Sequence, residues 1–185
     1  MTTSPTSEIF TVGHSTRSLD ELVSLLEGAQ ITQLVDVRSF PRSRRHPHFN
    51  AEVLSEALPG HGVDYVHAQA LGGFRKPAPV SVNAGWEHAA FRGYADYMAT
   101  DEFREALTEL DARARKRFTA IMCAEAQWWR CHRRLIADAM VVRAWTVLHL
   151  GLGGEPAAHE LTPFAVSGPD GNLTYPPAQP ELPLN

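Results

Sequence analysis

Cysteine is scarce in this chain, with only Cys123 and Cys131 among 185 residues. A small secreted domain held together by disulfides would carry several cysteine pairs. The first ten residues, MTTSPTSEIF, also lack the basic start and the apolar run of a signal peptide. We therefore expect a cytoplasmic protein whose stability comes from a hydrophobic core.

Long apolar runs and several common motifs are absent as well. No stretch approaches the roughly 20 residues that a helix needs to cross a bilayer, and neither end carries a polybasic or lipidation motif. Walker, GxGxxG and GxSxG motifs are missing, so a nucleotide cofactor and a serine hydrolase lack support. We expect no membrane attachment and no cofactor, and the sequence leaves the oligomeric state open.

Basic charge is low overall and unevenly distributed. The net charge of -4 argues against a nonspecific nucleic-acid binder. Residues 38–48, RSFPRSRRHPH, nevertheless hold four arginines and two histidines without one acid, while no Lys or Arg follows Arg143. This arginine-rich loop is interpreted either as an anion-binding element or as a solvated surface loop.

The apolar pattern predicts one α/β domain. Short apolar or β-branched runs, each followed by a turn or polar cluster, are typical of buried parallel strands. Such runs occupy residues 9–12, 33–37, 64–68, 119–122 and 146–149. Five strands are too few for an eight-stranded barrel, so we expect an open, mainly parallel five-stranded sheet with helices on both faces.

Helical patterns alternate with these strands. Ser18 and Glu21 form a capping-box pattern before the first helix, and Asn50 is placed to cap the second. Apolar residues at helical spacing predict two more helices, over 103–114 and around 135–140.

The C-terminal segment differs in composition from the rest. Residues 155–185 contain seven of the thirteen prolines, which predicts an irregular wrapping tail outside an α/β domain of residues 1–154. A short hairpin is expected around Asp170 and Gly171, with a loose end after Pro176.

Polar residues follow four of the five strand candidates. In open parallel sheets, ligands bind at the carboxyl ends of the strands, so we expect these residues to meet in one anion-binding cavity. They are His14, Asp36 with Arg38, Gly72 with Gly73 and Arg75, and Cys123 with Glu125. A lone histidine in such a place is more often structural, but four such strand ends favour function.

The sequence CHRR places Cys131, His132 and Arg133 at or just before the first turn of a helix. Free backbone N–H groups and the helix dipole favour an anion there and lower the pKa of a thiol. We expect Cys131 to be the more reactive thiol and Cys123 to be shielded. The alternative is that Cys131 is simply a small buried residue.

Two familiar cysteine sites do not fit the spacing. In a cysteine phosphatase loop, five residues separate the thiolate from its arginine, whereas six separate Cys123 from Arg130. A structural zinc site needs two close cysteine pairs, so we expect no metal. A mixed metal site is the alternative left open, with Cys123, Cys131, His132 and His14 as ligands.

Several motifs together resemble the uncharacterised bacterial family called domain of unknown function 488. They are TVGHST, VDVRSFPRSRR, LGGFR, GYADYM, and CAE followed by CHRRLIA. The resemblance extends from Phe10 to Gly151 and implies an α/β domain, without an established activity. It also implies a characteristic residue set, namely the strand-end residues above with Arg44, Tyr94, Cys131, His132 and Arg133. One departure is Trp128 beside Trp129, in a loop where similar proteins carry a proline; either the loop is packed or one ring faces a ligand.

The leading hypothesis is a hydrolase- or glycosylase-like enzyme acting on a phosphate-bearing substrate, either a nucleotide or a nucleic acid. The arginine-rich loop, Arg75 and the helix start at Cys131 would hold the anion. The proton-transfer candidates are the bases Glu125 and Asp36 and the acids His14 and His132. On a nucleic acid, base excision would fit such a pocket.

Two alternatives come from other classes. A noncatalytic module that senses a nucleotide or nucleic acid would need only the arginines. A cysteine-based redox enzyme would need Cys123 and Cys131 within disulfide range, with Cα atoms less than about 7 Å apart. We expect no disulfide between them.

Overall fold

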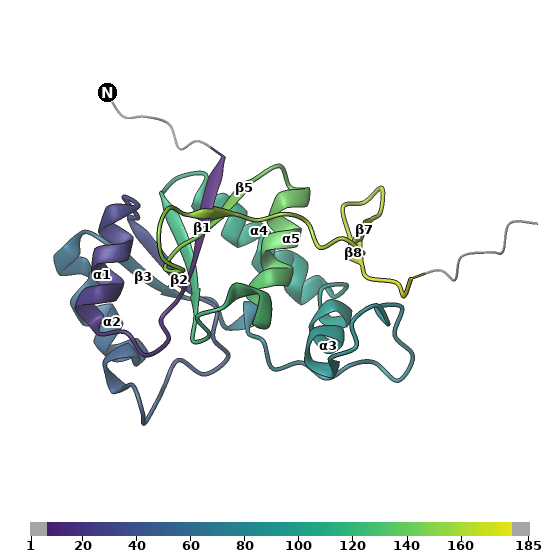
Figure 1. Ribbon diagram of the computed structural model, residues 1–185, viewed down its shortest axis with the longest axis horizontal. Coiled ribbons are helices and arrows are strands. Elements are labelled where there is room, and N and C mark those ends of the chain that lie inside the picture. The colour runs from purple at the N-terminus through teal and green to yellow at the C-terminus, as the bar shows by residue number, and fades with distance from the viewer. Residues whose placement is uncertain (1–6, 179–185) are drawn as a thin grey trace, which may run out of the picture.

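The protein is described here from a computed structural model over residues 7–178. Its main sheet has the strand order β3-β2-β4-β1-β5-β6, in which all neighbours except β5 and β6 are parallel (Figure 1). The strands are β1 (Glu8–Gly13), β2 (Gln33–Asp36), β3 (Asp64–His67), β4 (Thr119–Cys123), β5 (Thr146–His149) and β6 (Ala157–Ala158). The expected open, mainly parallel sheet is confirmed, and the tail adds the short sixth strand β6.

The central strands β2, β4 and β1 are apolar because helices cover both faces of the sheet. Successive side chains point to opposite faces. On β1, Ile9 joins one buried cluster and Phe10 the other. On β4, Ile121 and Met122 divide in the same way. These runs therefore lack the alternation of a half-exposed strand.

Five α-helices flank the sheet (Figure 1). They are α1 (Leu19–Gly28), α2 (Ala51–Ala57), α3 (Ala89–Tyr97), α4 (Asp101–Ala114) and α5 (Arg133–Val142). Apolar residues of α1 and α2 pack with Phe10 and Met122, whereas those of α3, α4 and α5 pack with Ile9 and Ile121. No helix within residues 7–178 is long and apolar enough to cross a membrane.

Four of these helices match the sequence pattern, and α3 does not. A glycine in a helix interior weakens the helical signal, and Gly93 lies in the middle of α3. Its place is dictated by packing, because a Cβ atom there would lie 2.5 Å from the backbone oxygen of Arg75. Close packing therefore requires Gly93, the same residue that weakens the helical pattern in the sequence.

The expected helix caps behave differently from each other. The Ser18 hydroxyl accepts from Glu21 N, and the Glu21 carboxylate accepts from Ser18 N, so the capping box is present. Asn50 occupies the N-cap of α2 but makes no capping bond with its side chain. Its amide oxygen accepts from Ser43 N at 2.7 Å and thereby secures the arginine-rich loop.

The C-terminal segment wraps over the domain. Its expected hairpin is confirmed, with β7 (Val166–Ser167) paired to β8 (Leu173–Thr174) around Gly171, which has φ +76°. Tyr175 is completely buried in the core. The division of the chain at residue 154 stays a prediction, and most of the expected loose end, residues 179–185, lies outside the described residues.

Candidate functional site

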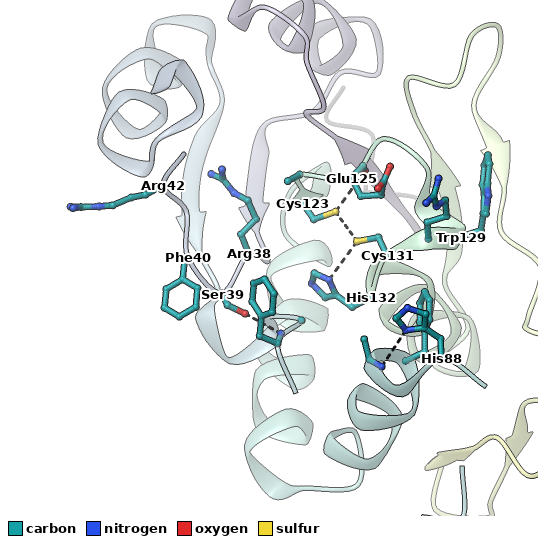
Figure 2. Close-up of a pocket in the computed structure, with 16 residues that line it drawn as sticks. Arg38, Ser39, Phe40, Arg42, His88, Cys123, Glu125, Trp129, Cys131 and His132 are labelled. Atoms are coloured by element: carbon teal, nitrogen blue, oxygen red, sulfur yellow. Dashed lines mark hydrogen bonds between the residues drawn. The ribbon is translucent and has the colours of Figure 1, made fainter. Parts of the chain in front are cut away.

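A cavity of about 810 Å³ opens at the carboxyl ends of β2 and β4 (Figure 2). Cys123, Cys131 and His132 lie at its centre. The loop after β2 lies on one side, and Trp129 with His88 lies on the other. The lining residues are Arg38, Ser39, Phe40, Arg42, Gly73, Phe74, His88, Ala90, Phe91, Cys123, Ala124, Glu125, Trp129, Arg130, Cys131 and His132.

The two cysteines meet in this cavity. Cys123 ends β4, and Cys131 lies two residues before α5. Both are free thiols, and their Sγ atoms are 2.7 Å apart. The cysteines are 3% and 8% exposed, so only a small face of each reaches the cavity. The tertiary structure therefore brings together the thiol pair that a redox reaction requires, although we expected no disulfide there.

Arg133 is buried beneath the thiol pair and does not line the cavity. It is 1% exposed, and its Nε donates to the Cys123 Sγ at 3.0 Å. Its Nη2 donates to the backbone oxygens of Glu125 and Ala126, at the turn between the cysteines. Arg133 was expected to bind substrate, but this position makes it the cation that faces the sulfurs.

The two thiols have different acidities. Burial raises the pKa of Cys123 well above that of an ordinary cysteine. Burial acts in the same direction on Cys131, but the hydrogen bond from Cys123 and the positive charge of Arg133 outweigh it and lower the Cys131 pKa to about 7. The start of α5 contributes, because Arg133 N donates to the Cys131 sulfur at 3.5 Å. Cys131 is thus the more acidic thiol of the pair.

His132 can act as a base toward Cys131. Burial lowers the pKa of His132, so its ring is neutral near pH 7. Its Nε2 lies 2.9 Å from the Val37 oxygen and must carry the proton, since a carbonyl only accepts. Nδ1 is then an acceptor, 3.4 Å from the Cys131 sulfur. A base aligned with its nucleophile by a third group is the arrangement of a covalent catalyst.

Neighbouring residues hold the His132 ring in place. Tyr94 packs at 5.2 Å between ring centroids and donates its hydroxyl to the Leu71 oxygen. Gly73 lies against the ring, where an added Cβ atom would come within 2.6 Å of Nδ1. Gly72 is similarly close to Ser39. These three predicted residues therefore shape the cavity by packing.

Asp36 is not available as a general base in this structure. It is fully buried, and its carboxylate accepts from the Arg38 Nε at 2.8 Å and from the Tyr65 hydroxyl at 2.7 Å. Arg38 lines the cavity, but it also donates to the Phe49 oxygen at 2.7 Å. Asp36 thus neutralises and orients Arg38.

His14 supports the same arginine and does not line the cavity. Its ring stacks on Phe49 with centroids 4.3 Å apart, and Nδ1 lies 2.9 Å from the Ser15 oxygen. Burial lowers the pKa of His14 to about 4, so the neutral ring accepts from Arg38 through Nε2 at 3.3 Å. A proton donor role at neutral pH does not fit this position.

Two other predicted arginines lie outside the cavity. The Arg75 guanidinium sits 3.6 Å from the centroid of the Tyr97 ring and donates to the Gly72 and Ala70 oxygens. Arg44 is exposed on the arginine-rich loop. The exposed cations that do reach the cavity are Arg42 and Arg130.

Two aromatic residues at the mouth of the cavity, Phe40 and Phe74, were missed by the sequence analysis. Phe40 and Phe74 are 70% and 82% exposed, with ring centroids 6.1 Å apart. Trp129 also lines the cavity, whereas Trp128 stacks flat on His149 at 4.1 Å. The available signal was their position beside predicted site residues, since Phe40 follows Arg38 and Phe74 follows Gly73. Exposed rings at a cavity mouth are a common binding feature.

The alternative of a mixed metal site gains no support from the geometry. Within residues 7–178, no group of three or more His, Cys, Asp or Glu side chains is arranged to hold a metal ion.

Comparison with known proteins agrees with the motifs. No curated protein and no solved structure matches the chain. The family model described as "Domain of unknown function DUF488" matches residues 18–140, which include the loop after β2, both cysteines, His132 and Arg133. The chain therefore belongs to the DUF488 family.

Proposed function

We propose that this chain is an enzyme that uses Cys131 as a thiolate nucleophile on an anionic, phosphate-bearing substrate. One observation carries the proposal: the Cys131 sulfur contacts the His132 Nδ1 and the Cys123 sulfur at the floor of the cavity. A noncatalytic binding module would have no need for a thiol with a pKa of about 7 beside an aligned base.

The remaining lining residues support an anionic substrate with a flat group. Arg42 and Arg130 are exposed at the cavity and can pair with phosphate oxygens. Phe40, Phe74 and Trp129 offer rings against which a base can stack. A nucleotide, free or within a nucleic acid, combines both features.

The proposed reaction proceeds in two steps. His132 accepts the thiol proton, the Cys131 sulfur forms a bond to an electrophilic atom of the substrate, and the leaving group takes the proton from His132. Water then cleaves the sulfur–substrate bond and restores the thiol. Glu125 is an exposed carboxylate at the cavity and is the group suited to deprotonate that water. The acid–base pair of the leading hypothesis thus becomes Glu125 with His132.

A second candidate function is thiol–disulfide exchange, favoured by the 2.7 Å between the sulfurs. The Cys131 thiolate would attack a small disulfide and release one thiolate, leaving a mixed disulfide. The Cys123 sulfur, after losing its proton, would attack Cys131 and release the second thiol. The protein dithiol would be oxidised while the small disulfide is reduced to two thiols.

Alkylation tests the nucleophile directly. We expect iodoacetamide to label Cys131 first, with a rate that rises through a midpoint near pH 7 and levels off above it, because only the thiolate reacts. Peptide mass spectrometry identifies the labelled residue. Cys131→Ser should remove this phase, and Cys123→Ser should retain a fast phase at a shifted midpoint. A midpoint above pH 8.5, or first labelling at Cys123, would contradict the proposal.

Thermal shifts test the anion. We expect inorganic phosphate and nucleoside monophosphates to raise the melting temperature through binding to the native state. Arg130→Ala and Arg42→Ala should each weaken that shift. The matched control is Arg113→Ala, which removes an exposed arginine paired with Glu109 on α4, away from the cavity. Equal weakening by the control, or no shift with any phosphorylated compound, would remove phosphate from the proposal.

The same measurements separate the two candidates. Glutathione disulfide should leave wild-type protein without a Cys123–Cys131 disulfide if the covalent reaction on phosphate-bearing substrates is the function. Rapid, complete formation of that disulfide, with two glutathione molecules released per chain, would select thiol–disulfide exchange instead.

A further inference from the structure

A continuous line of buried polar side chains leads away from the thiol pair. The Arg133 Nη1 donates to the Thr11 hydroxyl at 3.1 Å, and that hydroxyl lies 2.7 Å from the His149 Nδ1. The His149 Nε2 lies 3.0 Å from the His159 Nδ1, and the His159 Nε2 lies 2.9 Å from the Asp138 carboxylate. All five side chains are less than 9% exposed. Neither the sequence analysis nor the proposed reaction uses the last four.

The chemistry of the two ends sets the direction of every hydrogen bond between them. A guanidinium can only donate, so Thr11 accepts from Arg133 and directs its own O–H to His149. His149 therefore accepts at Nδ1 and donates from Nε2. A carboxylate only accepts, so His159 donates from Nε2 to Asp138 and accepts at Nδ1. Both rings thus carry their proton on Nε2, and each bond donates away from the thiol site.

The fold holds this line rigidly at both ends. Thr11 on β1 and His149 on β5 are directly paired in the sheet. Asp138 on α5 also accepts from the Tyr175 hydroxyl and from Thr162 N, both at 2.9 Å. Burial lowers the pKa of His149 to about 3, so its ring stays neutral and the direction persists at neutral pH.

The buried charge of Arg133 explains why such a line is needed. No carboxylate of the described residues lies within 4.0 Å of its guanidinium. A buried cation without a direct counter-ion is costly unless its donors are all used and negative charge is close. The polarised line links it to Asp138 on one side, and the Cys123 sulfur, which contacts the Cys131 sulfur, faces it on the other.

We propose that Thr11, His149, His159 and Asp138 are positioning residues that hold the Arg133 guanidinium against the Cys123 sulfur and so favour ionisation of the neighbouring Cys131 thiol. The inference rests on the proposed function for its purpose, since an ionised thiol is what a nucleophilic reaction requires. The proposal also gives Trp128 a role in packing, because its ring stacks on His149 with an interplanar angle of 6°. The loop between the two cysteines thereby packs on the same line.

A pair of substitutions at one position tests the proposal without any substrate. Thr11→Val keeps the shape of the side chain but removes the hydroxyl, whereas Thr11→Ser keeps the hydroxyl and removes the methyl. The readout is the thiolate absorbance at 240 nm as a function of pH. We expect Thr11→Val to raise the thiol pKa by about one unit, a tenfold fall in the ionisation constant, and Thr11→Ser to keep the wild-type value. Equal shifts in both variants, or a shift in neither, would overturn the proposal.

A measurement on the unmodified protein covers the case in which Thr11→Val does not fold. Two-bond ¹H–¹⁵N correlation spectra report which ring nitrogen of each histidine carries the proton. We expect His149 and His159 both to carry it on Nε2, and His149 to stay neutral from pH 5 to pH 8. A proton on Nδ1 of either ring would break the required direction and overturn the proposal. Neither experiment measures turnover. A failure to find the proposed activity would therefore not contradict this inference, and a failure of this inference would not contradict the proposed activity.

Discussion

Replacing Arg133 with methionine is expected to shift the Cys131 pKa from about 7 back toward the 9.0 of an ordinary cysteine. The arginine side chain supplies the nearby positive charge, while burial alone acts in the opposite direction. The backbone hydrogen bond from residue 133 to the Cys131 sulfur remains in the variant. Methionine fills a similar volume without charge. The alkylation rate at pH 7 should therefore fall about tenfold or more, because the thiolate becomes the minor species.

The same substitution should also destabilise the fold. The Glu125 and Ala126 carbonyls and the Thr11 hydroxyl would each lose a buried donor. We expect a loss of about 3 kcal/mol in the free energy of unfolding, measured by urea denaturation. The matched control is Arg134→Met, since Arg134 is the next residue but donates to Thr162 and lies over the Trp86 ring. An unchanged thiol pKa in Arg133→Met, or an equal rise in the control, would remove Arg133 from the thiol site.

Replacing Asp36 with asparagine is expected to cost about 3–5 kcal/mol of stability, because it leaves the buried Arg38 without its counter-ion. The variant keeps the size of the side chain, so lost packing contributes little. Urea denaturation measures the loss. The control is Glu52→Gln, which breaks an ion pair with Arg42 whose side chains are 61% and 77% exposed. Exposed pairs contribute less than about 1 kcal/mol, so the control should be nearly neutral.

The Asp36 variant also separates a structural role from a catalytic one. Folded Asp36→Asn protein should keep the pH midpoint of Cys131 alkylation, since the carboxylate does not contact either thiol. A stable variant that loses all activity on a phosphate-bearing substrate would instead return Asp36 to the position of general base. The pairing of Asp36 with Arg38 and Tyr65 makes the first outcome the expected one.

Most of the secondary structure could be predicted from the sequence because the patterns that indicate it involve neighbouring residues. All five predicted strands occur, and β5 matches its predicted bounds, since each is a short apolar run between turns. The helix start at Arg133 was visible for the same reason. The helix α3 was missed because Gly93 weakens its helical pattern. That glycine is required by close packing against the backbone of Arg75, which is distant in the sequence, so no local pattern predicts it.

The candidate site was located more accurately than its parts were assigned. The principle that ligands bind at the carboxyl ends of parallel strands selected the edge of the sheet where the cavity opens. Cys123, Glu125, Cys131, His132, Arg38 and Gly73 line one cavity there. His14 and Asp36 come from the same strand ends and Arg133 from the start of α5, but their side chains turn into the protein. Residue type and strand position cannot distinguish a side chain that faces substrate from one that supports it.

The sequence by itself determined the alternation of strands and helices, the open sheet, the family and the edge where reactive residues gather. These depend on hydrophobic periodicity and on short motifs, both of which are carried by neighbouring residues. Only the tertiary structure decided that two sulfurs eight positions apart touch, that Asp36 belongs to Arg38, and that Thr11, His149, His159 and Asp138 lead to Arg133. Those relations depend on distance and burial, because a charge or proton is held by whichever group lies within about 3 Å of it, however far away along the chain.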